Sequence, residues 1–133
     1  MVKSMYYRIP VGDILIRQGH DRIPIAEHAY HQALVKRDGR LYEKVINKSP
    51  VQQSKKSGTW KGFRKLKRRI ERDGYQHKRS DPITMKFAEN GRPYVSHGRH
   101  RIVLLRYIHG ADSRVTVKMK NGVGEVIGIS RVS

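Results

Sequence analysis

The sequence predicts an α+β fold in which helices pack on a small mixed sheet, and three observations predict it. Short runs rich in β-branched and aromatic residues, bounded by Gly and Pro, are typical of strands. Two longer segments repeat apolar residues at steps of three and four, as amphipathic helices do. The length of 133 residues fits one domain with a modest core, so we expect residues 1–133 to form a single domain.

The chain begins with a predicted strand followed by a helix. The run YYRIPVGDILI, residues 6–16, combines β-branched and aromatic residues and leads into a turn at Gly12 and Asp13. Residues 24–37 carry apolar side chains at helical spacing, and the RDGR that follows breaks the pattern with a glycine. The spacing therefore predicts a helix over about 24–37.

The next segment is harder to assign. The run LYEKVINK, residues 41–48, fits either a strand or a short helix, because its periodicity is mixed. The run SPVQQSKKSG is polar and rich in Ser, Lys and Gln, which is typical of a loop. We expect a helical insertion around 24–50 and a basic loop around 49–58.

The run TWKGFRKLKRRIERDG, residues 59–74, predicts an amphipathic helix. Thr59 is a suitable N-cap and Gly74 a suitable terminator. We expect the aromatic residues of its apolar stripe to belong to the core rather than to stack on bases. That stripe consists of Trp60, Phe63, Leu66 or Lys67, and Ile70.

The second half of the chain predicts a strand hairpin, a helix and a further strand. DPITMKF and RPYVSH are short extended runs, and the Asn90-Gly91 pair between them is a hairpin turn signal. IVLLRYIHG predicts a helix that packs on the sheet and ends at Gly110. SRVTVKMKN predicts another strand, and NGVGEVIGISRVS fits either one more edge strand or a tail.

The chain is strongly basic, with 29 Lys and Arg against 11 Asp and Glu and a formal net charge of +18. This imbalance favours an anionic partner, and nucleic acid, DNA in the first place, is the leading candidate. No apolar run approaches the length of a membrane span and no signal-peptide core is present, so we expect a cytoplasmic protein without a membrane partner. The absence of cysteine excludes disulfides, thiolate metal ligands and cysteine nucleophiles.

The predicted helix over 59–74 carries a candidate nucleic-acid surface. Like charges at its adjacent turns cost helix stability, and a polyanion would offset that cost. A solvated face that serves solubility is the alternative, although solubility rarely requires a single sign of charge. The expected nucleic-acid contacts are Lys61, Arg64, Lys65, Lys67, Arg68, Arg69 and Arg72.

A second basic cluster, SHGRHR, stands immediately before the predicted helix IVLLRYIHG. A helix N-terminus offers unpaired backbone N–H groups and a partial positive charge, and Arg and His strengthen both. The leading candidate for an anion at this position is a phosphate.

The order of these motifs resembles the N-terminal domain of ParB-type partition proteins and their sulfiredoxin relatives, over about Tyr7 to Met119. The segments that carry the resemblance are IPVGDI, ERDGY, PITMKF, GRPYVSHGRHRIVLLRYIHG and RVTVKM. In that superfamily a Gly-x-x-Arg turn opens a helix after a strand and binds nucleotide phosphates. The matching residues here are Gly98, Arg99, His100 and Arg101.

The resemblance implies a nucleotide pocket at this turn, with a nucleoside triphosphate as the candidate cofactor. The glycine would let the backbone approach the phosphate, and Arg101 would give a forked contact to phosphate oxygens. Arg22 follows the first strand, where these proteins place an arginine near the pocket. An exposed turn is the alternative for Asp21 and Arg22.

The chain also departs from the family pattern. Sulfiredoxins carry a catalytic Cys in this turn, so their chemistry is excluded here. Partition proteins continue into a helix-turn-helix and a dimerisation domain, so we expect a stand-alone fold of the phage or mobile-element kind. Where many members carry an acid, His97 precedes Gly98, which argues against metal-assisted phosphoryl chemistry.

Histidines supply the remaining candidate sites. His97 and His100 are candidate acid and base catalysts for phosphodiester hydrolysis, although neighbouring cations favour the neutral imidazole. Glu27, His28 and His31 lie at helical spacing, but the sequence nominates no further ligand. We therefore interpret these histidines as surface or structural residues and predict no metal site.

Three functions fit these observations. We favour a basic, largely sequence-nonspecific DNA-binding protein on a ParB-like fold that binds nucleotide or phosphate. The first alternative is a nuclease or nucleotide hydrolase centred on the turn, which a divalent-metal requirement would reveal. The second alternative is a module that binds an acidic host protein, which competition between that protein and DNA would reveal.

Overall fold

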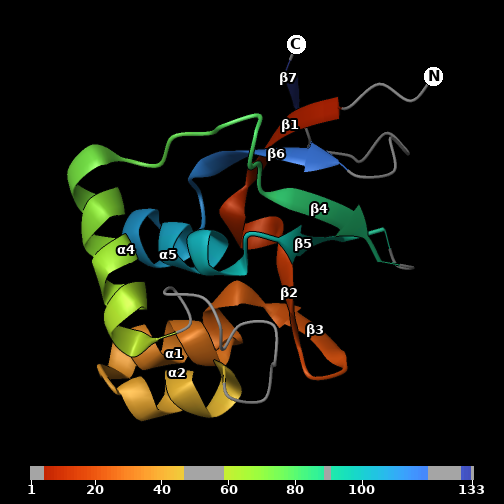
Figure 1. The fold of residues 1–133 in the computed structure, drawn as a ribbon. Helices are drawn as coiled ribbons and strands as arrows, with labels where there is room; N and C mark the ends of the chain where they lie inside the picture. The colour runs from red at the N-terminus through yellow and green to blue at the C-terminus, as the bar shows by residue number, and fades with distance from the viewer. Residues whose placement is uncertain (1–4, 47–58, 89–90, 120–129, 133) are drawn as a thin grey trace.

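One mixed sheet runs through the protein. The computed structural model describes residues 5–46, 59–88, 91–119 and 130–132 (Figure 1). The strand order is β3-β2-β5-β4-β6-β1-β7, in which β2–β5 and β4–β6 are parallel and the other neighbours antiparallel. The described strands are β1 Met5–Pro10, β2 Leu15–Gln18, β3 Asp21–Pro24, β4 Thr84–Phe87, β5 Pro93–His97, β6 Arg114–Met119 and β7 Ser130–Val132.

The helices gather beside the sheet, to its left and below it in Figure 1. α5 packs against β5, and α4 and α1 pack in turn on α5. Among the residues that the structure describes, no helix is both long and apolar enough to cross a membrane. The described helices are α1 Ala29–Lys36, α2 Gly39–Ile46, α4 Trp60–Asp73 and α5 Arg99–His109, and the 3-10 turns are η1 Val11–Asp13 and η2 Ile25–Glu27.

Alternation of side chains along the strands gives the sheet one buried face and one open face. Ile9 on β1 lies opposite Val115 on β6, and both are buried. Arg8, the neighbour of Ile9, lies opposite Thr116 and is exposed. The buried face forms the core together with α5. The helices and the mixed sheet confirm the predicted α+β class.

A cluster of aromatic rings joins the helices to one another. The rings of Tyr42 and Phe63 are stacked with centroids 4.8 Å apart, and Tyr30 lies 4.8 Å from Tyr42. All three side chains are buried. Because Phe63 comes from α4, this cluster fixes the face that α4 turns to solvent. The prediction that Trp60 and Phe63 are core residues is confirmed for Phe63, and Trp60 is half-buried against the core.

The structure corrects the first half of the predicted element map. The predicted turn at Gly12 and Asp13 is the 3-10 turn η1, which separates β1 from β2. The prediction of a helix from 24 is wrong, because β3 and η2 occupy 21–27 and α1 begins only at Ala29. LYEKVINK, which the pattern left undecided, lies largely in helix α2. The expected basic loop around 49–58 lies outside the described residues.

The second half follows the prediction closely. The hairpin of β4 and β5 is confirmed, and Gly91 adopts φ +81 in its turn, although Asn90 lies outside the described residues. The predicted helix before Gly110 is α5, which begins three residues earlier than its apolar run, at Arg99. β6 is confirmed, and β7 adds an edge strand next to β1.

Candidate nucleic-acid interface

Helix α4 forms where the local sequence predicts it. Thr59 is the N-cap, and its hydroxyl accepts a 2.9 Å hydrogen bond from the Gly62 N–H. Gly74 ends the helix at φ +76, and its N–H donates to the Ile70 carbonyl at 2.8 Å. Phe63 and Ile70 lie about two turns apart on the same face of α4, and both are buried. The 14 residues of α4 therefore present a rigid face about 21 Å long to solvent.

Five cations on α4 have no carboxylate partner among the described residues. All five are exposed, and none of them forms an ion pair within the part of the chain that the structure describes. We call this set the α4 basic face. Its members are Lys61, Arg64, Lys65, Arg68 and Arg69.

The two other predicted contacts on α4 are neutralised within the helix. Lys67 lies 3.0 Å from the Glu71 carboxylate, one turn along, and its ammonium sits 5.7 Å from the centre of the Tyr107 ring. Arg72 lies 2.9 Å from the Asp73 carboxylate and lowers the pKa of that group. Within the described residues, two of the seven predicted contacts therefore have a carboxylate partner and five have none.

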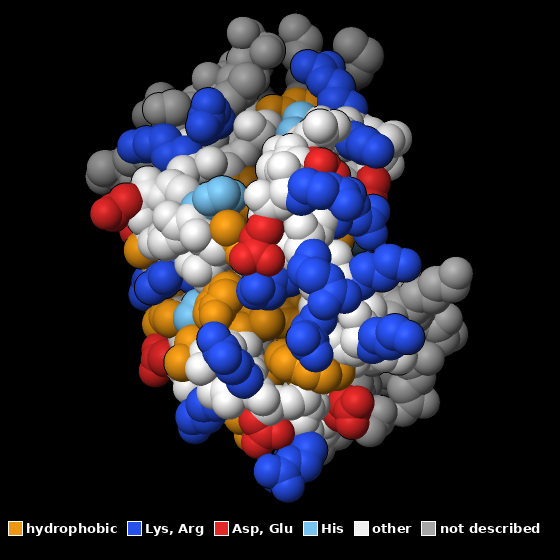
Figure 2. Space-filling model, turned by 90° about the vertical axis from the view of Figure 1, so that its left-hand side faces the viewer, with side chains coloured by type: hydrophobic (Ala, Val, Ile, Leu, Met, Phe, Trp, Pro, Cys, Tyr) orange, Lys and Arg blue, Asp and Glu red, His pale blue; other side chains and the backbone are white. Residues whose placement is uncertain are grey.

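Figure 2 views the molecule from the side on which α4 lies. Lys and Arg side chains spread over this face, and patches of hydrophobic side chain and several carboxylates lie among them. A hollow of about 350 Å³ opens beside α4, and both aromatic and basic side chains line it. The lining residues are Leu34, Arg37, Trp60, Arg64, Lys67 and Tyr107.

The turn before α5 has the backbone that the motif requires. Gly98 is the N-cap of α5 and adopts φ +97, a left-handed conformation that glycine adopts without strain. A Cβ at this position would lie 3.0 Å from Ile83 Cγ1 and 3.1 Å from an Arg101 guanidinium nitrogen. Close packing therefore adds to the backbone requirement for glycine.

A carboxylate from elsewhere in the chain reaches this turn. Asp81, just before β4, places Oδ1 2.8 Å from His97 Nε2. Arg101 donates to the Asp81 backbone carbonyl at 2.7 Å and lies 3.4 Å from Oδ1. Sequence reasoning missed Asp81 because it lies 16 residues before His97 and only the pairing of β4 with β5 brings the two together. The Arg101 guanidinium, which was expected to bind phosphate, is thus hydrogen-bonded to Asp81 in this structure.

The other side chains of the turn point to separate places. His100 faces the aromatic cluster, stacks on Tyr30 with centroids 5.0 Å apart, and shares a 2.9 Å hydrogen bond with the Tyr42 hydroxyl. The Arg99 charge helps to lower the pKa of His28, the N-cap residue of α1. Of the four residues expected to converge on one phosphate, the structure brings together only Gly98 and Arg101.

Arg22 lies on β3 rather than in a turn. Its guanidinium carbon sits 4.2 Å from the centre of the Tyr94 ring on β5, four residues before the glycine of the turn. Cation–π stacking of this kind holds an exposed arginine flat on a sheet. The hollow that Arg101 lines does not include Arg22.

His28 and His31 at the start of α1 are buried, which corresponds to the structural rather than the surface alternative. His28 Nδ1 accepts the Tyr30 N–H at 3.0 Å and caps α1, and burial, followed by the Arg99 charge, lowers its pKa to about 4. Burial, followed by the Arg106 charge, lowers the pKa of His31. Glu27 is exposed, and the described residues contain no group of three or more His, Asp or Glu able to hold a metal.

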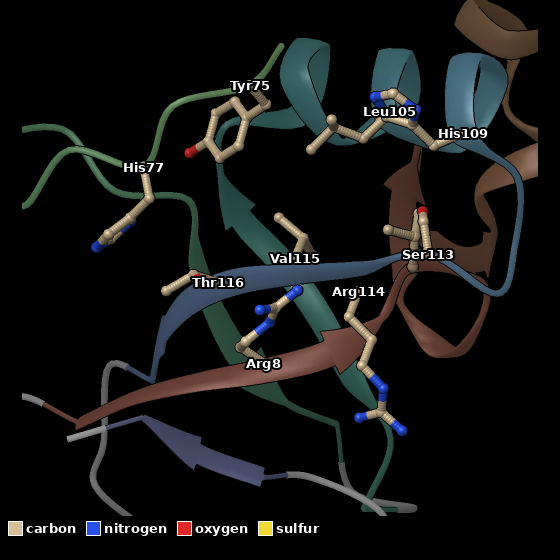
Figure 3. A pocket seen from close by; sticks show the side chains of 10 residues that line it. Arg8, Tyr75, His77, Leu105, His109, Ser113, Arg114, Val115 and Thr116 are labelled. Carbon is tan, nitrogen blue, oxygen red and sulfur yellow. The ribbon is translucent and has the colours of Figure 1, made fainter.

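Two further hollows flank the segment between α4 and β4. One, of about 580 Å³, lies between the end of α4 and the Asp81–Arg101 contact. Figure 3 shows the other, of about 260 Å³, with Tyr75 and His77 on one side, α5 above it, and Arg8 and Arg114 on β1 and β6. None of the described residues that line the second hollow is a carboxylate. Arg8 and Arg114 therefore make this hollow part of the positively charged surface of the sheet.

Comparisons with known proteins add no family to this description. No protein-family model, curated protein or solved structure matches the chain.

Proposed function

We propose that this protein binds duplex DNA through the α4 basic face with little dependence on base sequence. The observation that carries the proposal is the set of five exposed cations on one rigid helix, none partnered by a carboxylate within the described chain. In water alone, such like charges at adjacent turns destabilise the helix. Phosphates along a duplex would neutralise them and release counterions.

Contacts of this type position a protein without reading sequence. Lys and Arg that reach phosphate oxygens fix the register on the duplex and carry no base information. The aromatic residues of α4 do not supply readout either, because Phe63 is buried and Trp60 packs against the core. The binding expected from this face is therefore salt-dependent and weakly selective.

The test is a salt titration of DNA affinity with two variants of equal charge. Five neutralised phosphates predict a log–log salt slope of about −4.5 for the wild type. The α4 variant, Arg64→Gln, Lys65→Gln and Arg68→Gln, leaves two contacts and predicts a slope of about −1.8. The control variant removes three exposed cations from α1 and α2, by Lys36→Gln, Arg40→Gln and Lys44→Gln. Identical slopes in the two variants would reject the α4 basic face as the contact.

A second candidate function is the binding of nucleotide phosphate at the turn before α5, as the ParB-like resemblance implies. The observation that favours it is the left-handed Gly98 at an N-terminus that has no side-chain cap. The first N–H groups of a helix have no acceptor within it and suit a phosphate. Arg101 would have to leave Asp81 to contribute. Calorimetry with ATP tests this function, and absence of heat at millimolar nucleotide would reject it.

A further inference from the structure

The open face of the sheet carries its own set of cations. Tyr94 lies opposite Leu15 of β2 and Lys86 of β4, and cross-strand partners share a face. Register and alternation extend this face from β3 across to β1. We call its basic residues the sheet basic face: Arg8, Arg17, Arg22, Lys86, Arg114 and Lys118.

These side chains are available to a partner. The four arginines are exposed and the two lysines half-exposed, whereas the alternating residues of the same strands form the core. Asp21 is the single carboxylate on the described strands. It lies opposite Gln18 in the register of β2 and β3, and both residues belong to the face of the sheet that does not carry these cations. None of the six cations forms an ion pair with a carboxylate within the described residues.

Two features of the sheet basic face indicate an extended polyanion rather than a small ion. Arg17 lies directly opposite Arg22, and like charges in that arrangement destabilise a sheet unless an anion lies over them. Figure 3 shows the guanidinium groups of Arg8 and Arg114 pointing apart, so they do not close on one ion. The cations span six strands, or about 24 Å. Duplex DNA carries about 14 phosphates over that length.

The two basic faces belong to elements that lie on different sides of α5 (Figure 1). Figure 1 places α4 at the far left and the sheet at the right, with α5 between them. A duplex lying along α4 therefore leaves the open face of the sheet free. We propose that the sheet basic face binds a second segment of duplex DNA, so that one protein molecule bridges two duplexes. This proposal rests on the proposed function for the first of the two segments.

The test is a bridging assay. A 30-base-pair duplex is fixed to beads, protein is added to saturation, and retention of a second, labelled 30-base-pair duplex is measured. The sheet variant is Arg8→Gln, Lys86→Gln and Lys118→Gln, and it is compared with the α4 and control variants of equal charge. We expect the wild type and the control variant to retain the labelled duplex, and the sheet and α4 variants to retain at least fivefold less.

Protein held on the beads is measured in parallel, because the proposal requires the sheet variant still to bind the fixed duplex. The variant Lys86→Arg and Lys118→Arg preserves charge and should bridge like the wild type, which separates charge from damage to the fold. Wild-type bridging by the sheet variant would overturn the proposal, since it would mean that two protein copies join the duplexes. Wild-type bridging by the α4 variant, together with loss of bridging in the sheet variant, would instead overturn the proposed function on α4, because bridging requires both faces.

Discussion

Acidification from pH 7.5 to 4.5 should destabilise the fold through His28, whose side chain is 1% exposed. Burial and the Arg99 charge lower its pKa from 6.5 to about 4. Between these values the unfolded chain binds more protons than the folded chain, so stability falls as pH falls. The contribution is complete above pH 6.5 and is lost as pH drops towards 4. This shift predicts a loss of about 2.5 kcal/mol by pH 4.5.

Urea unfolding followed by far-UV circular dichroism at both pH values measures the loss. The variant His28→Asn keeps an acceptor for the Tyr30 N–H at the α1 N-cap and removes the titrating group. His31 is present in both proteins, so its lowered pKa cancels in the comparison. The wild type should lose about 2.5 kcal/mol more than the variant. Equal losses would refute the reasoning that His28 is held neutral by burial.

Three further predictions concern α4 and the turn before α5. Phe63→Ala should lower the free energy of unfolding by about 3 to 5 kcal/mol, because it empties the centre of the aromatic cluster, and a loss below about 1 kcal/mol would contradict that packing. Gly98→Ala should lower the thermal midpoint more than Gly74→Ala, because both glycines have positive φ but only Gly98 has close neighbours; equal midpoints would argue against the contact with Ile83. Supercoiled plasmid incubated with the protein and Mg²⁺ should stay uncut, and nicking that disappears in His97→Ala would show that the His97–Asp81 pair is catalytic.

Local signals explain why α4 and the hairpin of β4 and β5 could be predicted from sequence. A cap, an apolar stripe and a terminator all lie within the 16 residues of TWKGFRKLKRRIERDG, and they agree with one another. β3 was missed because a four-residue strand is stabilised by its pairing with β2 rather than by its own pattern. Gly19, at φ +63 between the two strands, was the available signal.

The candidate site was predictable only in part, for a similar reason. The cations of α4 are visible in the sequence, but which of them are neutralised depends on helix geometry that places Lys67 beside Glu71. At the turn before α5, the ParB-like resemblance implied that His100 and Arg101 both contribute to phosphate binding. The fold instead buries His100 among aromatic rings and bonds Arg101 to Asp81. Contacts between residues far apart in sequence leave no periodic pattern to detect.

The most direct test of the account is lysine footprinting of α4 in the presence of duplex DNA. Lys61 and Lys65 are exposed, so an acylating reagent followed by mass spectrometry reports their reactivity in the free protein and in the complex. The account predicts that both lysines lose reactivity when one equivalent of duplex is bound at low salt, and regain it at high salt as the contacts dissociate. Unchanged reactivity at Lys61 and Lys65 while DNA is bound would contradict it.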